Sequence, residues 1–295
     1  MKYNEVEVIE SCDYDASTIR ENESECTNEP LSPHKHENSP FYQALETALS
    51  RQQNSLTTIA EPGDVVARRV LHDYGAIFVA NESVLPPPVC VFTCEEDVAE
   101  FQERAGFRGV EMGGALIELQ PAAANALLQA QAAAQAQGLD ITPRDGAEAA
   151  RRSYDDTVRL WNSRFLPALD HWQELGSLTE EQTKWLRALP MAEQVAEVLE
   201  LEKQGVFFSK DFSKSILYSI AAPGTSQHIA MLAFDANEFF DERVREILAR
   251  HGWFQTVLSD LPHFTFLGLQ ETELPARGLK SVEVHQQRFW IPDVG

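Results

Sequence analysis

The segment PGTSQHIAMLAFD, residues 223–235, carries a histidine and an aspartate seven residues apart. A second segment, SDLPHF at residues 259–264, adds another histidine and another aspartate. Two imidazoles and one carboxylate, with a fourth position left for water, form a ligand set that suits catalytic zinc. The two segments therefore predict a metal centre built from His228, Asp235 and His263.

The spacing of the first two ligands constrains the local fold. In an unbroken strand their Cα atoms would lie about 23 Å apart on opposite faces. On a helix they would lie about 10 Å apart along the axis, whereas each ligand atom must come within about 2 Å of the ion. A turn must therefore separate them, with a loop at Pro223-Gly224 and a strand at 232–234 that leads into Asp235. Spacing alone leaves open that the histidines only cap helices or form hydrogen bonds.

The order of these residues resembles that in a known enzyme family. SQHIAMLAFD at 226–235, followed by DLPHF at 260–264, is similar to the motifs of the zinc D-Ala-D-Ala carboxypeptidase and dipeptidase family. That family also contains phage L-alanyl-D-glutamate endopeptidases, whose form of the second motif is the most similar. GWF at 252–254 resembles the family's Gly-aromatic turn, and the resemblance covers roughly residues 111–269.

The resemblance implies a role for each matching residue. His228, Asp235 and His263 would bind Zn²⁺, which acidifies water and polarises a carbonyl group. Asp260 would be the general base for the attacking water and then the acid for the leaving amine. Ser226 matches the serine that lies near the first histidine of the family.

The family also uses an arginine at a strand-to-helix junction to bind the carbonyl or carboxylate of the substrate. Arg144 follows a predicted strand at 139–142, whereas Arg152 begins the text Arg-Ser-Tyr that the family shares. Thr157 stands where the family usually has glutamine. Because arginine pairs well with carboxylates, both Arg144 and Arg152 remain candidates for substrate binding.

Three features depart from the family pattern. Met231 replaces a usual glycine, so the loop between the ligands is bulkier, and extra residues separate Arg144 from Arg152. Residues 1–7 contain no apolar signal core, although most members of the family are exported. The sequence as written predicts a cytoplasmic protein, and the resemblance suggests the cell envelope.

Composition narrows the classes of partner. The chain has 295 residues, of which 43% are hydrophobic, so it can bury a sizeable core. Its net charge of -22 repels phosphate backbones, which excludes nucleic acid as a partner. No apolar run reaches membrane-spanning length. The expected partner is a peptide or peptidoglycan-derived substrate.

The pattern along the chain predicts an α+β fold in which a small mixed or antiparallel sheet carries the zinc site and helices pack on it. The predicted parts are a disordered acidic tail at 1–40, a small α/β unit at 41–110, a zinc peptidase domain at 111–270 and a C-terminal strand extension at 271–295. Buried strands are expected at 76–80 and 89–92 in the α/β unit, and alternation predicts another strand at 282–291. The predicted helices cover residues 41–49, 65–74, 95–105, 121–137, 148–164, 179–190, 191–204 and 241–251.

The cysteines give a weak signal. Cys90 and Cys94 form a C-x3-C pair with no second pair nearby, so we expect buried free thiols, with a disulfide or a second metal site as the alternatives. Cys12 and Cys26 lie in the acidic tail.

Taken with the resemblance, the predicted activity is hydrolysis of a peptide bond next to a D-amino acid in peptidoglycan stem peptides. A D-alanyl-D-alanine carboxypeptidase is the first expectation and an L-alanyl-D-glutamate endopeptidase the second. The rival classes are a hydrolase of cytosolic peptides or amides and a non-catalytic binding module of the same fold.

Overall fold

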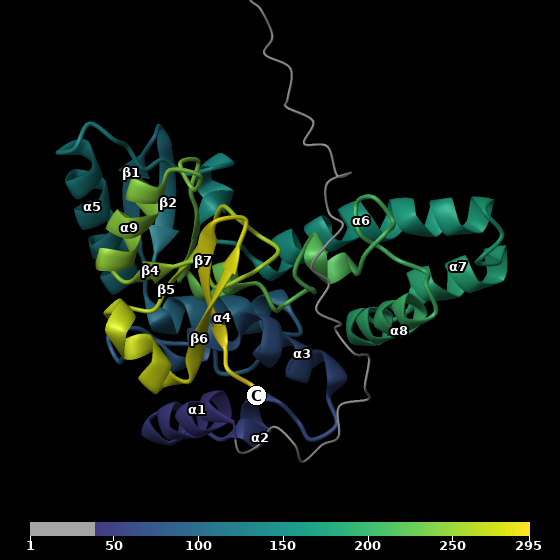
Figure 1. Ribbon diagram of the computed structural model, residues 1–295. Helices are drawn as coiled ribbons and strands as arrows, with labels where there is room; N and C mark the ends of the chain where they lie inside the picture. Colours follow the sequence, from purple (N-terminus) through teal and green to yellow (C-terminus); the bar gives the residue numbers. More distant parts are fainter. Residues whose placement is uncertain (1–38) are drawn as a thin grey trace, which may run out of the picture. The chain divides into compact units, whose positions relative to one another are not determined.

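The computed structural model describes residues 39–295, all of which belong to one compact unit. The predicted tail at 1–40, with Cys12 and Cys26, lies outside the described residues except for its last two positions. Helices and small antiparallel sheets make up the described part (Figure 1), so the α+β class is confirmed. None of the described helices is both long and apolar enough to cross a membrane.

The helices follow local sequence signals. Thr179 and Gln182 form the predicted capping box, Asp64 caps α3 through its side chain, and Pro121 starts α5. The α-helices are α1 (Pro40–Arg51), α2 (Leu56–Ile59), α3 (Val65–Tyr74), α4 (Glu95–Ala105), α5 (Pro121–Gln135), α6 (Tyr154–Glu174), α7 (Glu180–Ala188), α8 (Met191–Lys203) and α9 (Glu242–Arg250). The 3₁₀ helices are η2 (Gly75–Val79), η3 (Gly146–Ala149), η4 (Ile216–Tyr218), η5 (Gln227–Ala230) and η6 (Glu271–Arg277).

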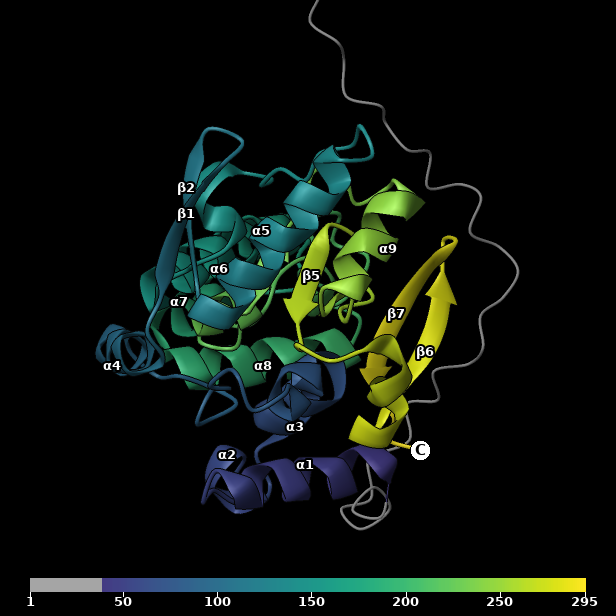
Figure 2. The ribbon, with the colours of Figure 1, turned by 90° about the vertical axis from the view of Figure 1, so that its left-hand side faces the viewer.

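The strands among the described residues form three antiparallel sheets. The central sheet has the order β3-β5-β4, with β3 (Ala233–Asp235), β5 (His263–Phe266) and β4 (Trp253–Phe254). Two hairpins accompany it, β1 (Arg108–Met112) with β2 (Ala115–Leu119), and β6 (Leu279–Val284) with β7 (Gln287–Pro292). Figure 2 shows β6 and β7 beside the central sheet, with α1 and α2 at the opposite end of the molecule from α5 and α9.

Several predicted strands are wrong. Residues 76–80 lie in the buried 3₁₀ helix η2 and its C-cap, because a short apolar run after a glycine fits a buried helical turn as well as a strand. Residues 89–92 form no strand. The segment 139–142 forms none either, and it is followed only by an isolated β-bridge between Pro143 and Ala236.

Two other segments differ in their boundaries. The alternation at 282–291 spans both strands of the β6–β7 hairpin, whose turn residues His285 and Gln286 have φ of 51° and 62°. The helix predicted at 148–164 begins at Tyr154 after the short turn η3 and continues to Glu174. Cys90 and Cys94 are free thiols, and only Cys90 is buried.

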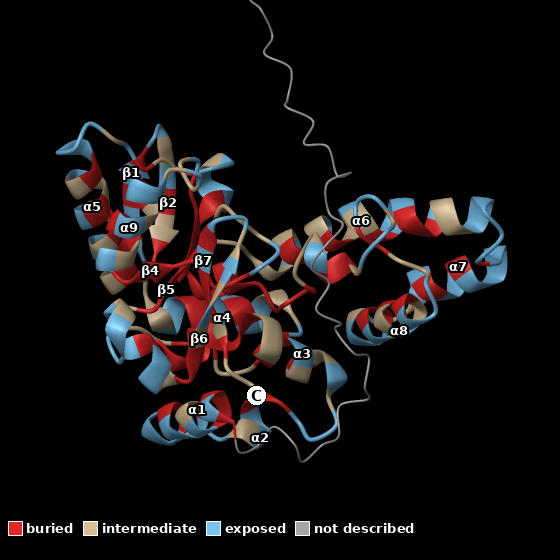
Figure 3. Ribbon diagram, in the orientation of Figure 1, coloured by how far each residue is buried: buried red, intermediate tan, exposed pale blue. Residues whose placement is uncertain are grey.

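Two hydrophobic cores support these elements. The main core joins α1, α3–α5 and α9 to the central sheet, and Figure 3 shows its buried residues around β4 and β5. A second core belongs to the helical lobe, which we define as residues 154–222 and which contains α6, α7, α8 and η4. The buried residues of the lobe are Trp161, Phe165, Ala168, Leu169, Leu178, Leu186, Val195, Val198, Phe208, Ile216, Leu217 and Ala222.

Candidate metal centre

His228, Asp235 and His263 meet at one edge of the central sheet. Asp235 ends β3 and lies directly opposite His263, the first residue of β5. His228 comes from η5, which immediately precedes β3. One ligand atom from each residue lies within 4.8 Å of the others, and all three residues are buried. This separation is suitable for three atoms that share one ion.

The turn that the spacing requires is η5 together with Met231. Ser226 caps η5 through its hydroxyl oxygen, which accepts a hydrogen bond from the amide of His228. Met231 then adopts a left-handed conformation, with φ of 55° and ψ of 33°, before the chain enters β3. A glycine would adopt this conformation more readily, and Met231 is nevertheless fully buried here.

The ring of His228 has one nitrogen engaged and one unused. Nδ1 lies 3.1 Å from the carbonyl oxygen of Ala150, to which it can only donate. Nε2 is buried and has no hydrogen-bond partner in the described chain, although it lies 3.3 Å from Oδ1 of Asp235. Burial first, and then the charge of Arg152, lowers the pKa of His228 to about 4. The ring is therefore neutral near pH 7, with an unused lone pair on Nε2, which is the form that binds metals.

His263 is oriented by a residue that the sequence did not single out. Its Nε2 lies 2.8 Å from Oε1 of Gln227, and its Nδ1 lies 3.1 Å from Oδ1 of Asp235. The Gln227 amide is itself fixed, because its nitrogen donates to the carbonyl of Tyr74 and its oxygen also accepts from Thr265. An amide oxygen only accepts, so Nε2 of His263 donates to Gln227, and Nδ1 is the nitrogen that faces Asp235. Gln227 is adjacent to a predicted ligand, which was the only local hint of its role.

Asp235 completes the group and is held from the other side by Arg152. Its Oδ1 faces both imidazoles, whereas its Oδ2 lies 3.0 Å from a terminal nitrogen of Arg152. Burial would raise the pKa of Asp235, but the adjacent His228 and His263 outweigh it and hold that pKa well below its usual value. Arg152, predicted to bind substrate, thus has a metal-ligand candidate as its partner.

Asp260 lies in the turn that leads into β5. The amide of His263 donates to the carbonyl oxygen of Asp260 over 3.2 Å, so the turn fixes one residue relative to the other. Burial, with a further contribution from the charge of Asp235, raises the pKa of the Asp260 carboxyl group. A raised pKa is suitable for a carboxylate that takes up and returns a proton.

All seven predicted site residues line one cleft of about 520 Å³. They are Arg144, Arg152, Ser226, His228, Asp235, Asp260 and His263. Arg144 is placed by its backbone amide, which donates to the carbonyl oxygen of Asp235 over 2.8 Å. Its guanidinium lies 5.8 Å from the ring centre of Phe239 and is 3.9 Å from an exposed carboxylate oxygen of Asp145. The side chain of Arg144 is therefore available to a ligand in the cleft.

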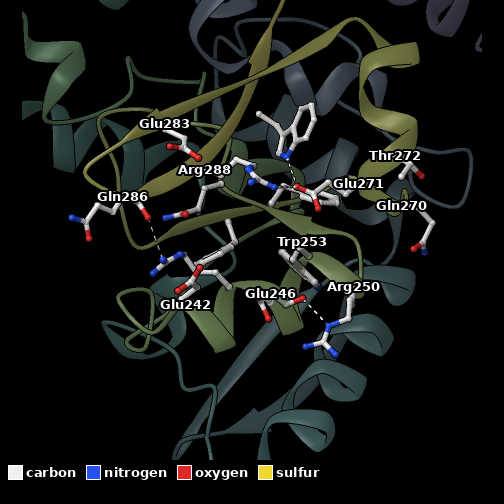
Figure 4. A pocket seen from close by; sticks show the side chains of 16 residues that line it. Glu242, Glu246, Arg250, Trp253, Gln270, Glu271, Thr272, Glu283, Gln286 and Arg288 are labelled. Carbon is white, nitrogen blue, oxygen red and sulfur yellow. Dashed lines mark hydrogen bonds and ion pairs between the residues drawn. The ribbon is translucent and has the colours of Figure 1, made fainter. Parts of the chain in front are cut away.

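A second cavity, of about 510 Å³, lies between α9, β4 and the β6–β7 hairpin (Figure 4). Trp253 lines it and packs against Phe234 and Phe266, and Arg288 pairs with Glu271 across it. None of the metal-ligand candidates lines this cavity. Trp253 and Phe254 of the aromatic turn do not line the metal cleft and belong to the main hydrophobic core.

Comparison with known proteins gives little. No family model matches the chain, and no curated protein matches it either. One similar solved structure is a zinc-bound mutant of the vancomycin resistance D,D-pentapeptidase VanY from a VanB-type resistance cassette. It shares 15% sequence identity, with 55% of this chain and 79% of that chain covered and a TM-score of 0.31.

Proposed function

We propose that this protein is a zinc-dependent peptidase that hydrolyses a peptide bond next to a D-amino acid. The observation that carries the proposal is the unused, buried Nε2 of His228, which faces Oδ1 of Asp235 beside Nδ1 of His263. A buried nitrogen without a partner is costly, and a metal ion would remove that cost.

The donor set fits zinc. Two imidazole nitrogens and one carboxylate oxygen are ligands that catalytic zinc uses, with a fourth position open. Each ligand also has the outer contact that such sites need: Ala150 for His228, Gln227 for His263 and Arg152 for Asp235. Three independent outer contacts support a metal role over chance proximity.

The side chains of the cleft have distinct tasks in this proposal. A bound zinc ion supplies a Lewis acid that polarises a carbonyl group and makes water more acidic. Asp260 takes the proton from the attacking water and returns it to the amine that leaves. Arg144 donates hydrogen bonds to the carbonyl or carboxylate of the substrate, and Ser226 and Arg152 keep His228 and Asp235 in place.

The metal assignment is tested by metal analysis of purified variants. We expect about one zinc per chain in the wild type and loss of most of it in His263→Ala. His251→Ala is the control, because His251 lies at the C-cap of α9 and is not one of the clustered ligands. Unchanged zinc content in His263→Ala would refute the assignment.

The substrate is tested by mass analysis of digested muropeptides. Release of terminal D-alanine would support the D-alanyl-D-alanine carboxypeptidase, which is our first choice. Cleavage between L-alanine and D-glutamate would support the endopeptidase, the alternative that the DLPHF form at 260–264 favours. Zinc binding without cleavage of any of these bonds would contradict the proposed substrate and favour one of the rival classes, a hydrolase of cytosolic peptides or amides or a non-catalytic binding module.

A further inference from the structure

Arg164 of α6 has an unusual environment. It lines the metal cleft, and its Nε is buried without a hydrogen-bond partner in the described chain. One terminal nitrogen donates to the hydroxyl of Ser163 over 2.9 Å. No carboxylate of the described residues forms an ion pair with Arg164. Most of the hydrogen-bonding capacity of this guanidinium, which has five N–H donors, is therefore unused.

The lack of an acidic partner is unexpected in this chain, which has 46 acidic and only 24 basic residues. The other arginines of the neighbourhood are paired. Arg152 contacts Asp235, Arg159 contacts both Glu148 and Asp156, and Arg187 contacts Asp170. A partly desolvated cation is unfavourable unless an anion compensates for it. A ligand in the cleft is the obvious source of such an anion.

The position of Arg164 on α6 limits how far that anion lies from the metal centre. Arg164 lies eleven residues beyond the N-cap Ser153, which is about 16 Å along α6. The start of α6 adjoins the metal centre, because the preceding Arg152 contacts Asp235. An extended peptide advances about 3.3 Å per residue, so a peptide that runs from the metal centre along α6 would reach Arg164 within about five residues.

The surroundings of Arg164 define the rest of this subsite. Leu160, one helical turn earlier, lies on the same face of α6 and also lines the cleft. Leu217, Tyr218 and Ile220 also line the cleft and add apolar surface, and Tyr218 is 53% exposed. The subsite therefore combines one unpaired cation with apolar walls, which suits an acidic residue flanked by aliphatic ones.

We propose that Arg164 binds a carboxylate of the substrate within about five residues of the scissile bond, so that the cleft selects acidic peptides. The inference rests on the proposed function, since it takes the ligand to be a peptide that crosses the metal centre. It assigns Arg164 and Arg144 to different anions, Arg144 next to the reacting bond and Arg164 further along α6.

The test uses a panel of zinc-loaded variants and matched peptides. Each peptide carries a single Glu at a different distance from the scissile bond, and a second peptide has Gln at the same place. The wild type should prefer the Glu peptide by about tenfold or more in kcat/KM at one distance, and Arg164→Gln should lose that preference while cleaving the Gln peptide normally. Arg159→Gln is the control, because Arg159 lies on the same helix, is exposed and is paired with Glu148.

Each other outcome is informative. Retention of the Glu preference by Arg164→Gln, or its loss in both variants, overturns the proposal. A lower melting temperature in Arg164→Gln without a change in selectivity indicates a structural role and also overturns it. If the wild type cleaves no peptide, the peptidase function fails. Calorimetric binding of the same Glu and Gln peptides then tests Arg164 separately, with equal affinities for the two counting against it.

Discussion

At the scale of single residues, each imidazole uses one ring nitrogen for a hydrogen bond to a neighbouring residue. That hydrogen bond determines which of the two nitrogens can bind a metal. The carbonyl of Ala150 engages Nδ1 of His228 and directs Nε2 towards Asp235, whereas the amide of Gln227 engages Nε2 of His263 and directs Nδ1 towards Asp235. The two histidines would thus bind through different nitrogens. Such outer contacts set both the tautomer and the orientation of a ligand, so their removal should weaken metal binding without removing a ligand.

Gln227 offers a direct test. Gln227→Leu removes the acceptor for Nε2 of His263, so we expect zinc affinity to fall about 10- to 100-fold, as measured by competition with a chelator. Gln227→Glu keeps an oxygen acceptor at this position and should retain more of the affinity. Equal zinc affinity in the leucine variant and the wild type would show that Gln227 does not orient His263.

Asp260→Asn tests the proton-transfer role. The amide cannot take up a proton, so we expect the variant to keep zinc and its fold while kcat falls by about 10²-fold or more. Asp145→Asn is the control, because Asp145 lines the same cleft with an 81% exposed side chain. Activity of Asp260→Asn within about tenfold of wild type, equivalent to roughly 1.4 kcal/mol in the barrier, would exclude Asp260 as the general base.

The candidate site could be predicted from the sequence only where local motifs mark it. The motif residues are brought together in the cleft, as the resemblance implies. Gln227 and Arg164 were missed, because the first depends on a contact 36 residues away and the second on the absence of a nearby acid. Arg152 was predicted from local text, which does not show that Asp235, 83 residues away, would be its partner.

At the scale of elements, helices with local start signals were predicted well and short buried strands were not. The segment 65–74 matches α3 and the segment 95–105 matches α4, because their signals are local: Asp64 caps α3 immediately before it begins, and three acidic residues occupy the first turn of α4. The segment 76–80 has no such signal. Its apolar residues would be buried in either conformation, and packing against α1 and α3 decides for a 3₁₀ helix.

The loop that leads to η5 depends on Gly224. Its φ is +76°, and a Cβ there would lie 2.0 Å from the carbonyl oxygen of Phe92. Its own amide donates to the hydroxyl of Thr157 and its carbonyl accepts from the amide of Phe92. The backbone of this loop is thus fixed on both sides just before Ser226 and His228.

We therefore expect Gly224→Ala to lower the free energy of unfolding and to reduce zinc content by displacing η5. Gly138→Ala is a matched control, since Gly138 has φ of +71° but open space around the position of the added Cβ. In the control, the left-handed backbone should lower the free energy of unfolding by about 1 kcal/mol. In Gly224→Ala, the clash should lower it by about 2 kcal/mol more. Chemical denaturation measures both, and equal losses would show that the contact with Phe92 is easily relieved.

At the scale of the whole molecule, the metal centre and the helical lobe have separate cores but share α6. The centre connects η5, β3 and β5, which belong to the main core. The first turn of α6 follows Arg152 at the metal centre, whereas Trp161 and Phe165 lie in the core of the lobe. This division leads us to expect that the lobe can open without breaking the metal centre, as separately stabilised regions often do.

Hydrogen exchange with and without zinc tests this division. At a zinc concentration about 100 times the Kd, binding adds about 2.7 kcal/mol to every opening that breaks the centre. The exchange of amides in 227–235 and 263–266 that depends on such openings should slow by about 100-fold, because about 2.7 kcal/mol corresponds to a factor of about 100 in the opening equilibrium. Amides of α7 and α8 should change little, because the lobe opens on its own. In His263→Ala, zinc should protect neither region. Equal protection of α7, α8 and the strands in the wild type would show that the two cores unfold as one unit, and that zinc stabilises the entire described chain through α6.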